Sequence, residues 1–194
     1  MPFFPNLTIE QRNLLFAQMT SESRVNGFWN AVLAQAAYFP IDQQNQPNYL
    51  VSPEERINAA SRLDLYITRL EWVGNPARQV NLVPVAVYEG KGSTAGDTWD
   101  SIRRQLHDYG QAITNQTPNL PGVYLMGGKG QDARFWFYKR GYYTNPLPIW
   151  VERGRVIVKD SSQLPTLYNV GTGFPEIDSI LRFIRTNPNP PVTR

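Results

Sequence analysis

The sequence predicts a mixed α/β fold in which helices flank a central β-sheet. Two observations lead to this class. Residues 97–113 carry apolar side chains at alternating intervals of three and four, the period of a helix that packs on one face. Residues 82–89 are almost continuously apolar, as expected of a strand that is covered on both faces. An amphipathic helix close to such a strand indicates helices layered on a sheet.

The composition restricts the class of protein further. The chain has 194 residues, of which 41% are hydrophobic and 12% aromatic, and this suits one folded domain. It has no cysteine and one histidine, which excludes disulfides, thiolate zinc sites and cysteine nucleophiles. It has no run of 18 apolar residues and does not begin with a signal-peptide pattern. We therefore expect no membrane span and an intracellular location, in the cytoplasm or nucleus.

The first part of the chain contains two helical patterns. Thr8 and Gln11 have the spacing of a capping box, which predicts a helix over residues 9–19. A second apolar pattern predicts a helix over residues 21–39, where Pro40 ends it.

A loop and two strands are predicted next. Residues 40–54 are rich in Gln, Asn and Pro and predict a loop, with one helical turn at residues 53–56. Residues 63–72 alternate between apolar and polar side chains, which predicts a strand. Residues 82–89 predict the central strand, where Pro84 is discordant because it cannot donate a hydrogen bond to the sheet.

The second half of the chain predicts a hairpin, a further strand and a final helix. After the helix over residues 97–113, these are the strands 122–126 and 134–139 joined by a Gly-Gly-Lys-Gly turn, the strand 155–160 and the helix 175–185. We expect a single domain over residues 1–186 and a disordered, Pro-rich tail over residues 187–194.

Glu89 and Lys91 are the first residues that suggest catalytic chemistry. They continue the alternation of the strand before them, so both project from one face at the end of a buried strand. A carboxylate beside an ammonium can hold a divalent cation next to a positive charge that stabilises a phosphate transition state.

Three further polar residues interrupt apolar patterns, and each allows two interpretations. Asp64 lies between two leucines, where it either caps the strand or pairs with Arg62, or belongs to a site. Glu22 lies on the apolar stripe of its helix, where it either interacts with the dipole at an exposed helix start or reaches a polar site. Gln105 borders the apolar stripe of residues 97–113 and is either a surface residue or part of a site.

This arrangement resembles the PD-(D/E)XK nuclease superfamily, which has the restriction-endonuclease-like fold. The resemblance rests on Asp64 in one strand, on Glu89-Gly90-Lys91 in the next, and on Gln105 and Tyr109 spaced as QxxxY in the following helix. It covers about residues 20–140 and implies an αβββαβ core. It also implies that Asp64, Glu89 and Glu22 bind Mg²⁺, with Mn²⁺ as a substitute.

The same resemblance implies a Mg²⁺-dependent nuclease that hydrolyses phosphodiester bonds through a metal-activated water. Lys91 would orient that water or stabilise the pentavalent phosphorane, and Gln105 would assist from its helix. Such enzymes usually cleave DNA and sometimes RNA. Because metal coordination lowers the pKa of bound water, this chemistry needs no histidine or cysteine base, which agrees with the composition.

The predicted partner is nucleic acid, with DNA preferred. Arg103, Arg104 and Lys129 are candidate contacts to its phosphates, and the alternative for each is a solvated basic face. The alternative function is a catalytically inactive protein with the nuclease fold that binds nucleic acid or protein, a second copy of itself included. A carbohydrate-binding β-sandwich is disfavoured by the helix over residues 97–113.

Overall fold

The computed structural model describes residues 6–35, 37–41, 48–56, 62–74, 79–141 and 145–193. Its elements are α1 (Ile9–Ala17), α2 (Glu22–Leu33), β1 (Asn48–Pro53), β2 (Leu65–Val73), β3 (Gln79–Lys91), α3 (Trp99–Gln116), β4 (Gly122–Lys129), β5 (Asp132–Lys139), β6 (Leu147–Glu152), β7 (Arg155–Lys159), β8 (Tyr168–Asn169), α4 (Phe174–Thr186) and β9 (Val192–Thr193).

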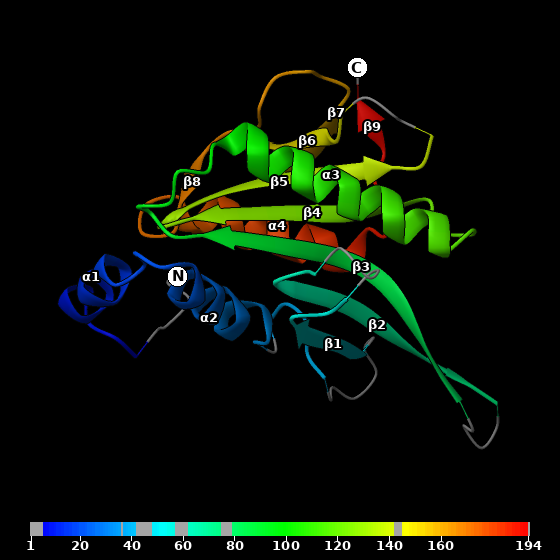
Figure 1. The fold of residues 1–194 in the computed structure, drawn as a ribbon, viewed down its shortest axis with the longest axis horizontal. Coiled ribbons are helices and arrows are strands. Elements are labelled where there is room, and N and C mark those ends of the chain that lie inside the picture. The colour runs from blue at the N-terminus through cyan, green and yellow to red at the C-terminus, as the bar shows by residue number, and fades with distance from the viewer. Residues whose placement is uncertain are drawn as a thin grey trace.

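The strands form one mixed sheet. Its order is β1-β2-β3-β4-β5-β6-β7-β9, and β8 pairs with β5 beside this path. The pairs β1/β2, β2/β3 and β4/β5 are antiparallel, whereas β3 and β4 are parallel and α3 makes the crossover between them (Figure 1). The predicted class, a mixed central sheet flanked by helices, is confirmed.

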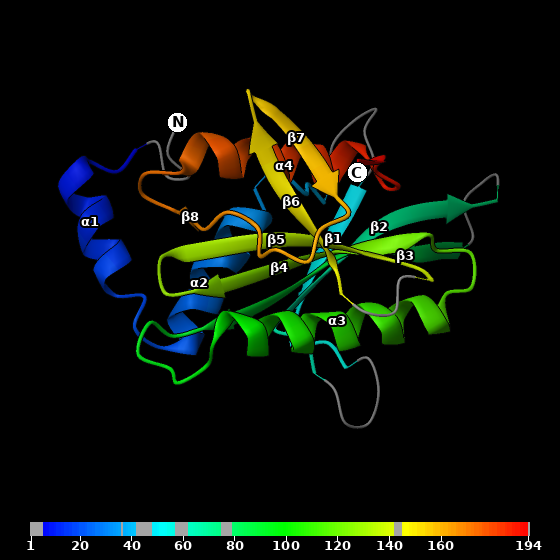
Figure 2. The ribbon, with the colours of Figure 1, turned by 90° about the horizontal axis from the view of Figure 1, so that it is seen from above.

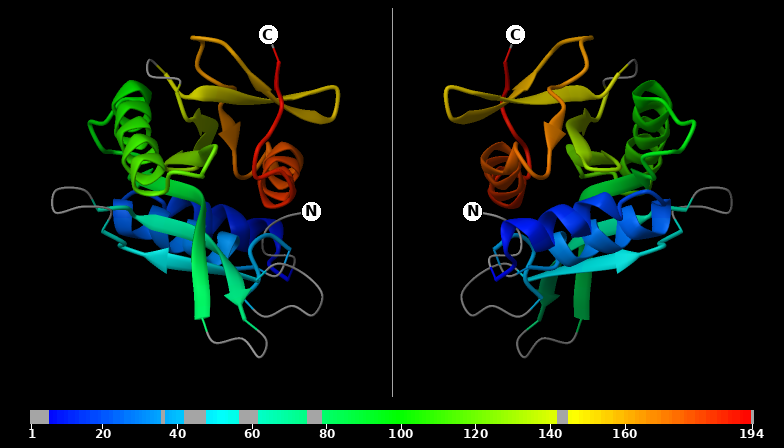
Figure 3. Two further views of the ribbon diagram at one scale, coloured as in Figure 1. Left: turned by 90° about the vertical axis from the view of Figure 1, so that its right-hand side faces the viewer. Right: turned by 90° about the vertical axis from the view of Figure 1, so that its left-hand side faces the viewer.

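Helices cover both faces of the sheet and define two parts of the core. On one face, α3 buries Ile102, Leu106 and Ile113 against the central strands. On the other face, α2 and α4 contribute residues such as Trp29 and Ile180 to a larger cluster. Figures 2 and 3 show α3 and α4 on opposite sides of β4 and β5. The end of β3 therefore lies in the layer between α2 and α3.

The first two helices form where the sequence predicts them, although the second is shorter. The capping box of Thr8 and Gln11 is confirmed. The predicted helix over residues 21–39 ends at Leu33. Tyr38 and Phe39, which the prediction included in this helix, are buried in the core from a turn instead. Burial of these two side chains, rather than helical pairing, explains their apolar character.

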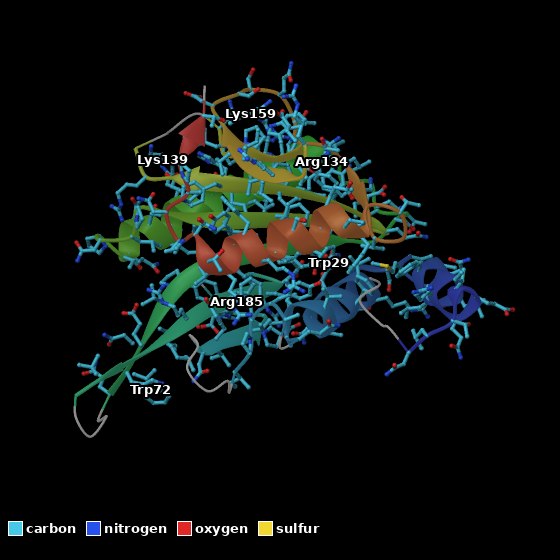
Figure 4. All side chains as sticks on the ribbon, turned by 180° about the vertical axis from the view of Figure 1, so that it is seen from behind. Trp29, Trp72, Arg134, Lys139, Lys159 and Arg185 are labelled. Atoms are coloured by element: carbon cyan, nitrogen blue, oxygen red, sulfur yellow. The ribbon has the colours of Figure 1, made fainter. Side chains whose placement is uncertain are left out.

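The central strand is longer than predicted and accommodates its proline at an irregularity of the sheet. Pairing between β2 and β3 shifts register between Ile67 and Thr68, and Pro84 pairs with Thr68 at that shift. A bulge leaves a backbone position without a partner, so the missing N–H of proline is tolerated there. Beyond this point β2 and β3 project from the body as a two-stranded arm, and Trp72 lies near its end (Figures 1 and 4).

Two predictions for residues 40–56 are wrong. The segment predicted as a loop contains β1, which pairs with β2 and buries Tyr49. The predicted helical turn at residues 53–56 is not helical, because Pro53 closes β1 and Glu54 adopts a left-handed φ of 57°. The partner strand supplies the pairing that the Gln/Asn/Pro composition does not reveal. Residues 42–47 lie outside the described residues.

The second half of the chain also differs in detail. Gly127, Gly128 and Lys129 belong to β4 rather than to the turn, which begins at Gly130 with a φ of 56°. The strands β6 and β8 are additional to the prediction.

The C-terminal segment is structured where the sequence predicts a disordered tail. β9 pairs in parallel with β7, the Thr193 hydroxyl donates to the Val158 carbonyl at 3.1 Å, and Pro190 is buried. None of the helices in the described residues is long and apolar enough to cross a membrane.

Candidate active site

The predicted site residues meet at the ends of β2 and β3. Leu65 pairs with Tyr88, so the antiparallel register brings Asp64, the residue before β2, beside Glu89. The Gly90 N–H donates to Asp64 Oδ2 at 2.7 Å, which fixes the carboxylate against the next strand. Two acids that are 25 positions apart in sequence therefore lie next to each other.

Asp64 is a partly buried carboxylate held by two donors. Burial raises its pKa, and the negative charge of Glu22 acts in the same direction. Hydrogen bonds from Gly90 N–H and from the Asn26 side chain oppose this rise, but the pKa stays above its ordinary value. The alternative interpretation, an ion pair with Arg62, does not apply because the guanidinium of Arg62 pairs with Glu54.

Glu89 is the most buried acid of the site. It is 2% exposed, and its Oε1 accepts hydrogen bonds from Lys91 Nζ and from Gln105 Nε2, each at 2.7 Å. Its Oε2 is buried and has no hydrogen-bond partner among the described residues. Burial and the negative charge of Asp64 raise the pKa of Glu89 to about 7. One oxygen of this carboxylate is thus available to a further ligand.

Lys91 links the end of β3 to α2 at the site. Its ammonium donates to Glu89 Oε1 at 2.7 Å and to Glu22 Oε2, on α2, at 3.2 Å. Burial lowers the pKa of Lys91, but the hydrogen bonds and negative charges of these two acids outweigh it and raise the pKa above its ordinary value. Lys91 is therefore a permanent positive charge rather than a base.

Gln105 belongs to the site and not to the surface. It projects from α3, and its Nε2 donates to the Tyr109 hydroxyl at 2.5 Å as well as to Glu89. Tyr109 in turn donates to the Arg62 carbonyl at 2.9 Å. This chain of hydrogen bonds ties α3 to the segment before β2 and fixes the orientation of the Glu89 carboxylate.

Sequence reasoning missed the polar residues on the α2 side of the site. The buried atoms Asn26 Oδ1 and Tyr88 OH have no hydrogen-bond partner among the described residues. Both atoms lie beside Gly90, where a Cβ would be 2.0 Å from Asn26 Oδ1 and 2.7 Å from Tyr88 OH. Asn26 follows Glu22 by one helical turn, and that spacing was the available signal.

Arg134 is a second residue that sequence reasoning missed. The sheet register places it two strands from Glu89, with Gly127 between them. Its guanidinium lies 5.0 Å from the centre of the Trp99 ring, and its Nε and Nη1 are buried without a partner among the described residues. Burial lowers the pKa of Arg134. Arg134 directly precedes the aromatic run of residues 135–138, and nothing in the local pattern distinguishes it from a surface arginine at the edge of a strand.

The donor atoms of the site suit a hard divalent cation that needs few protein ligands. Within the part of the chain that the structure describes, no three His, Cys, Asp or Glu side chains gather as a metal site. Asp64 and Glu89 offer carboxylate oxygens, of which Glu89 Oε2 is unpaired. Glu22, the third predicted ligand, contacts Lys91 instead. Two carboxylates fit Mg²⁺, which keeps several of its waters.

The predicted nucleic-acid contacts lie on α3 and at the end of β4. Lys129 Nζ donates to the Asp97 carbonyl at 2.6 Å, and Arg103 donates to Asn145 Oδ1 at 2.5 Å. Arg104 is exposed, and its Nε donates to the Asp100 carbonyl at 3.3 Å. Arg104 is therefore the most accessible of the three cations.

Comparisons of this chain with protein-family models, with curated proteins and with solved structures give no match.

Proposed function

We propose that this protein is a divalent-metal-dependent nuclease with the restriction-endonuclease-like fold, which hydrolyses phosphodiester bonds of nucleic acid, preferentially DNA. The observation that carries the proposal is the convergence of Asp64, Glu89, Lys91 and Gln105 in one partly buried, hydrogen-bonded cluster. The order α2-β1-β2-β3-α3-β4 supports it, because this is the αβββαβ order that the sequence resemblance implies.

Asp64 and Glu89 would hold the cation, Mg²⁺ or Mn²⁺. When bound, the ion would supply a water of lowered pKa and would neutralise charge on the phosphate. Burial and mutual repulsion keep the pKa of Glu89 near 7, so in the absence of a cation this carboxyl retains a proton up to neutral pH. The protein therefore brings together two acids whose charges are only partly compensated by their neighbours.

The remaining residues position charge and hold the two acids in place. Lys91 keeps its proton and would place a positive charge beside the phosphate oxygens. Gln105 fixes the orientation of Glu89, while Gly90 N–H fixes Asp64. The exposed guanidinium of Arg104 would contact the nucleic-acid backbone.

A cleavage assay with an isosteric variant tests this function. Plasmid, single-stranded DNA and RNA are incubated with Mg²⁺ or Mn²⁺, using wild type, Glu89→Gln and the control Glu10→Gln, which alters an exposed acid on α1. We expect cleavage by wild type and control that EDTA abolishes, and a loss of about 100-fold or more in Glu89→Gln. Equal cleavage by all three proteins would contradict the site.

One observation favours the alternative, an inactive protein of the same fold that binds nucleic acid or protein. Lys91 contacts both Glu22 and Glu89, so the cluster already contains an internal counter-charge. In that case the folded wild type cleaves no substrate and shows no increase in melting temperature with Mn²⁺. Retained binding of nucleic acid by Glu89→Gln would then support the interaction module.

A further inference from the structure

A cavity of about 520 Å³ lies between the β1–β2 pair and the C-terminal end of α4. It is lined by Ala37, Tyr49, Arg69, Arg182, Arg185, Thr186 and Pro188. Figure 4 shows Arg185 between the end of α4 and these strands. Arg69 is five residues along β2 from Asp64, or roughly 16 Å in an extended strand, so the cavity is separate from the candidate active site.

Every charged residue in this lining is an arginine. Arg69 comes from β2, and Arg182 and Arg185 come from the last turns of α4. Their acidic partners, Glu71 for Arg69 and Asp178 for Arg182, are not part of the lining. The cavity therefore gathers three guanidinium groups and no carboxylate.

The contacts that these arginines make inside the protein are compatible with a bound anion. Among the described residues, Arg182 pairs with both Asp178 oxygens through Nε, at 3.0 and 3.1 Å. Arg69 pairs with Glu71 two positions along the same strand, and Glu71 is 45% exposed. Exposed ion pairs contribute little to stability, so this one can be exchanged for a ligand at small cost.

Two of these cations act on Tyr49 at the wall of the cavity. Its hydroxyl donates to the Arg185 carbonyl at 3.1 Å, and its ring is buried at the wall of the cavity. Burial raises the pKa of Tyr49, while the positive charges of Arg185 and Arg69 both act to lower it. The two guanidinium groups, from different elements, therefore act on the same polar atom.

We propose that this cavity is a phosphate-binding site, held by Arg69, Arg182 and Arg185. Guanidinium groups match the oxygens of phosphate in charge and geometry and bind them through paired hydrogen bonds. The volume lies in the range of pockets for small ligands and exceeds the size of the anion itself, so the ligand is a phosphate ester. Its source is either a free nucleotide or the backbone of a nucleic acid. The proposal does not depend on nuclease activity.

The test measures binding to the full chain at constant ionic strength and in EDTA, so that metal at the candidate active site does not contribute. The probes are inorganic phosphate, adenosine monophosphate and an oligonucleotide without a terminal phosphate. Isothermal titration calorimetry measures the binding of each probe. The variants are Arg69→Gln and Arg182→Gln. The control is Arg155→Gln, which alters an exposed arginine at the start of β7.

We expect wild type and Arg155→Gln to bind with equal affinity, and each cavity variant to bind at least fivefold more weakly. Tighter binding of the mononucleotide identifies a free nucleotide as the source, whereas tighter binding of the oligonucleotide identifies a backbone. Equal binding by wild type and Arg69→Gln overturns the proposal, as does the absence of binding to wild type. If Arg182→Gln unfolds, Arg69→Gln decides alone, because its ion pair with Glu71 is local.

Discussion

Glu89 is the residue at which burial and charge repulsion act together, and this has a consequence for stability. Its pKa rises from an ordinary value of 4.5 to about 7 on folding. Between these values the folded protein binds more protons at Glu89 than the unfolded chain, so stability falls as pH rises through this range. Asp64, whose pKa is also raised, contributes with the same sign.

The first prediction is that Glu89→Gln removes most of this pH dependence. Measured without divalent ions, the free energy of unfolding of the variant relative to wild type should increase between pH 5 and pH 8, by on the order of 3 kcal/mol. Urea titrations at several pH values measure this difference. Saturating Mg²⁺ should stabilise wild type more at pH 8 than at pH 6. A difference that does not change with pH would show that Glu89 is ionised throughout.

Lys91 allows a second prediction that separates catalysis from structure. Lys91→Met keeps the aliphatic stem and removes the positive charge beside Glu89. If the charge acts on the phosphate, the variant should retain the Mn²⁺-induced rise in melting temperature and lose about 100-fold or more in cleavage rate.

The control for Lys91 is Lys159→Met, because Lys159 also pairs with a glutamate, Glu152, but at the surface. It should cleave like wild type. If Lys91→Met instead fails to fold, the result favours a structural role, in which the ammonium is the ion-pair partner of buried carboxylates.

At the scale of elements, the contact between α2 and β3 depends on a residue without a side chain. Gly90 lies opposite Asn26, and a Cβ there would come within 2.0 Å of Asn26 Oδ1. The third prediction is that Gly90→Ala destabilises the protein by about 1–3 kcal/mol, because the buried side chains of Asn26 and Tyr88 must shift away from the added methyl group. It should also weaken Mn²⁺ binding, since Asn26 helps to hold Asp64.

Gly27 provides the matched control in α2 itself. A Cβ at Gly27 meets no atom within 4 Å, so Gly27→Ala should raise stability by about 0.5–1 kcal/mol through helix propensity. Thermal unfolding of the two variants compares them directly. A Gly90→Ala protein as stable as Gly27→Ala would mean that α2 and β3 are not in close contact at this position.

The elements that could be predicted are those whose own side chains form a recognisable apolar pattern. α3 has a regular apolar stripe and β3 a continuous apolar run, and both form where the sequence predicts them. β1 and β6 were not predicted, because their hydrogen bonds come from β2 and from β5 and β7. Partner strands are not visible in a local pattern.

The same distinction applies to the candidate site. Glu22 and Asp64 were singled out because each interrupts an apolar pattern, and Gln105 because it borders one. The structure shows all three near Glu89 or Lys91. Asn26 and Arg134 interrupt nothing conspicuous, so only the folded arrangement of α2, β3 and β5 reveals them. Whether the cluster binds metal and cleaves nucleic acid stays a prediction for the assays above.

At the scale of the whole molecule, the C-terminal segment adds the last strand to the edge of the sheet. β9 pairs with β7, the Asp160 N–H donates to the Thr193 carbonyl at 2.9 Å, and Val192 packs against the larger core cluster. The sequence alone predicts a disordered tail over residues 187–194. These contacts instead make the segment part of the folded domain.

The fourth prediction tests this by deleting residues 190–194. Loss of the β7–β9 hydrogen bonds and of the burial of Pro190 should cost about 2 kcal/mol, which lowers the melting temperature by about 4–8 °C for a domain of this size. Calorimetry of the deletion variant measures the change, with Thr193→Ala as the control that removes only one hydroxyl contact and should cost less than half as much. An unchanged melting temperature would show that residues 190–194 do not stabilise the fold, as expected of a disordered tail. The deletion leaves Asp64, Glu89 and Lys91 in place, so cleavage below the melting temperature should persist. Loss of cleavage would show that the pairing of β9 with β7 supports the site at the end of β3.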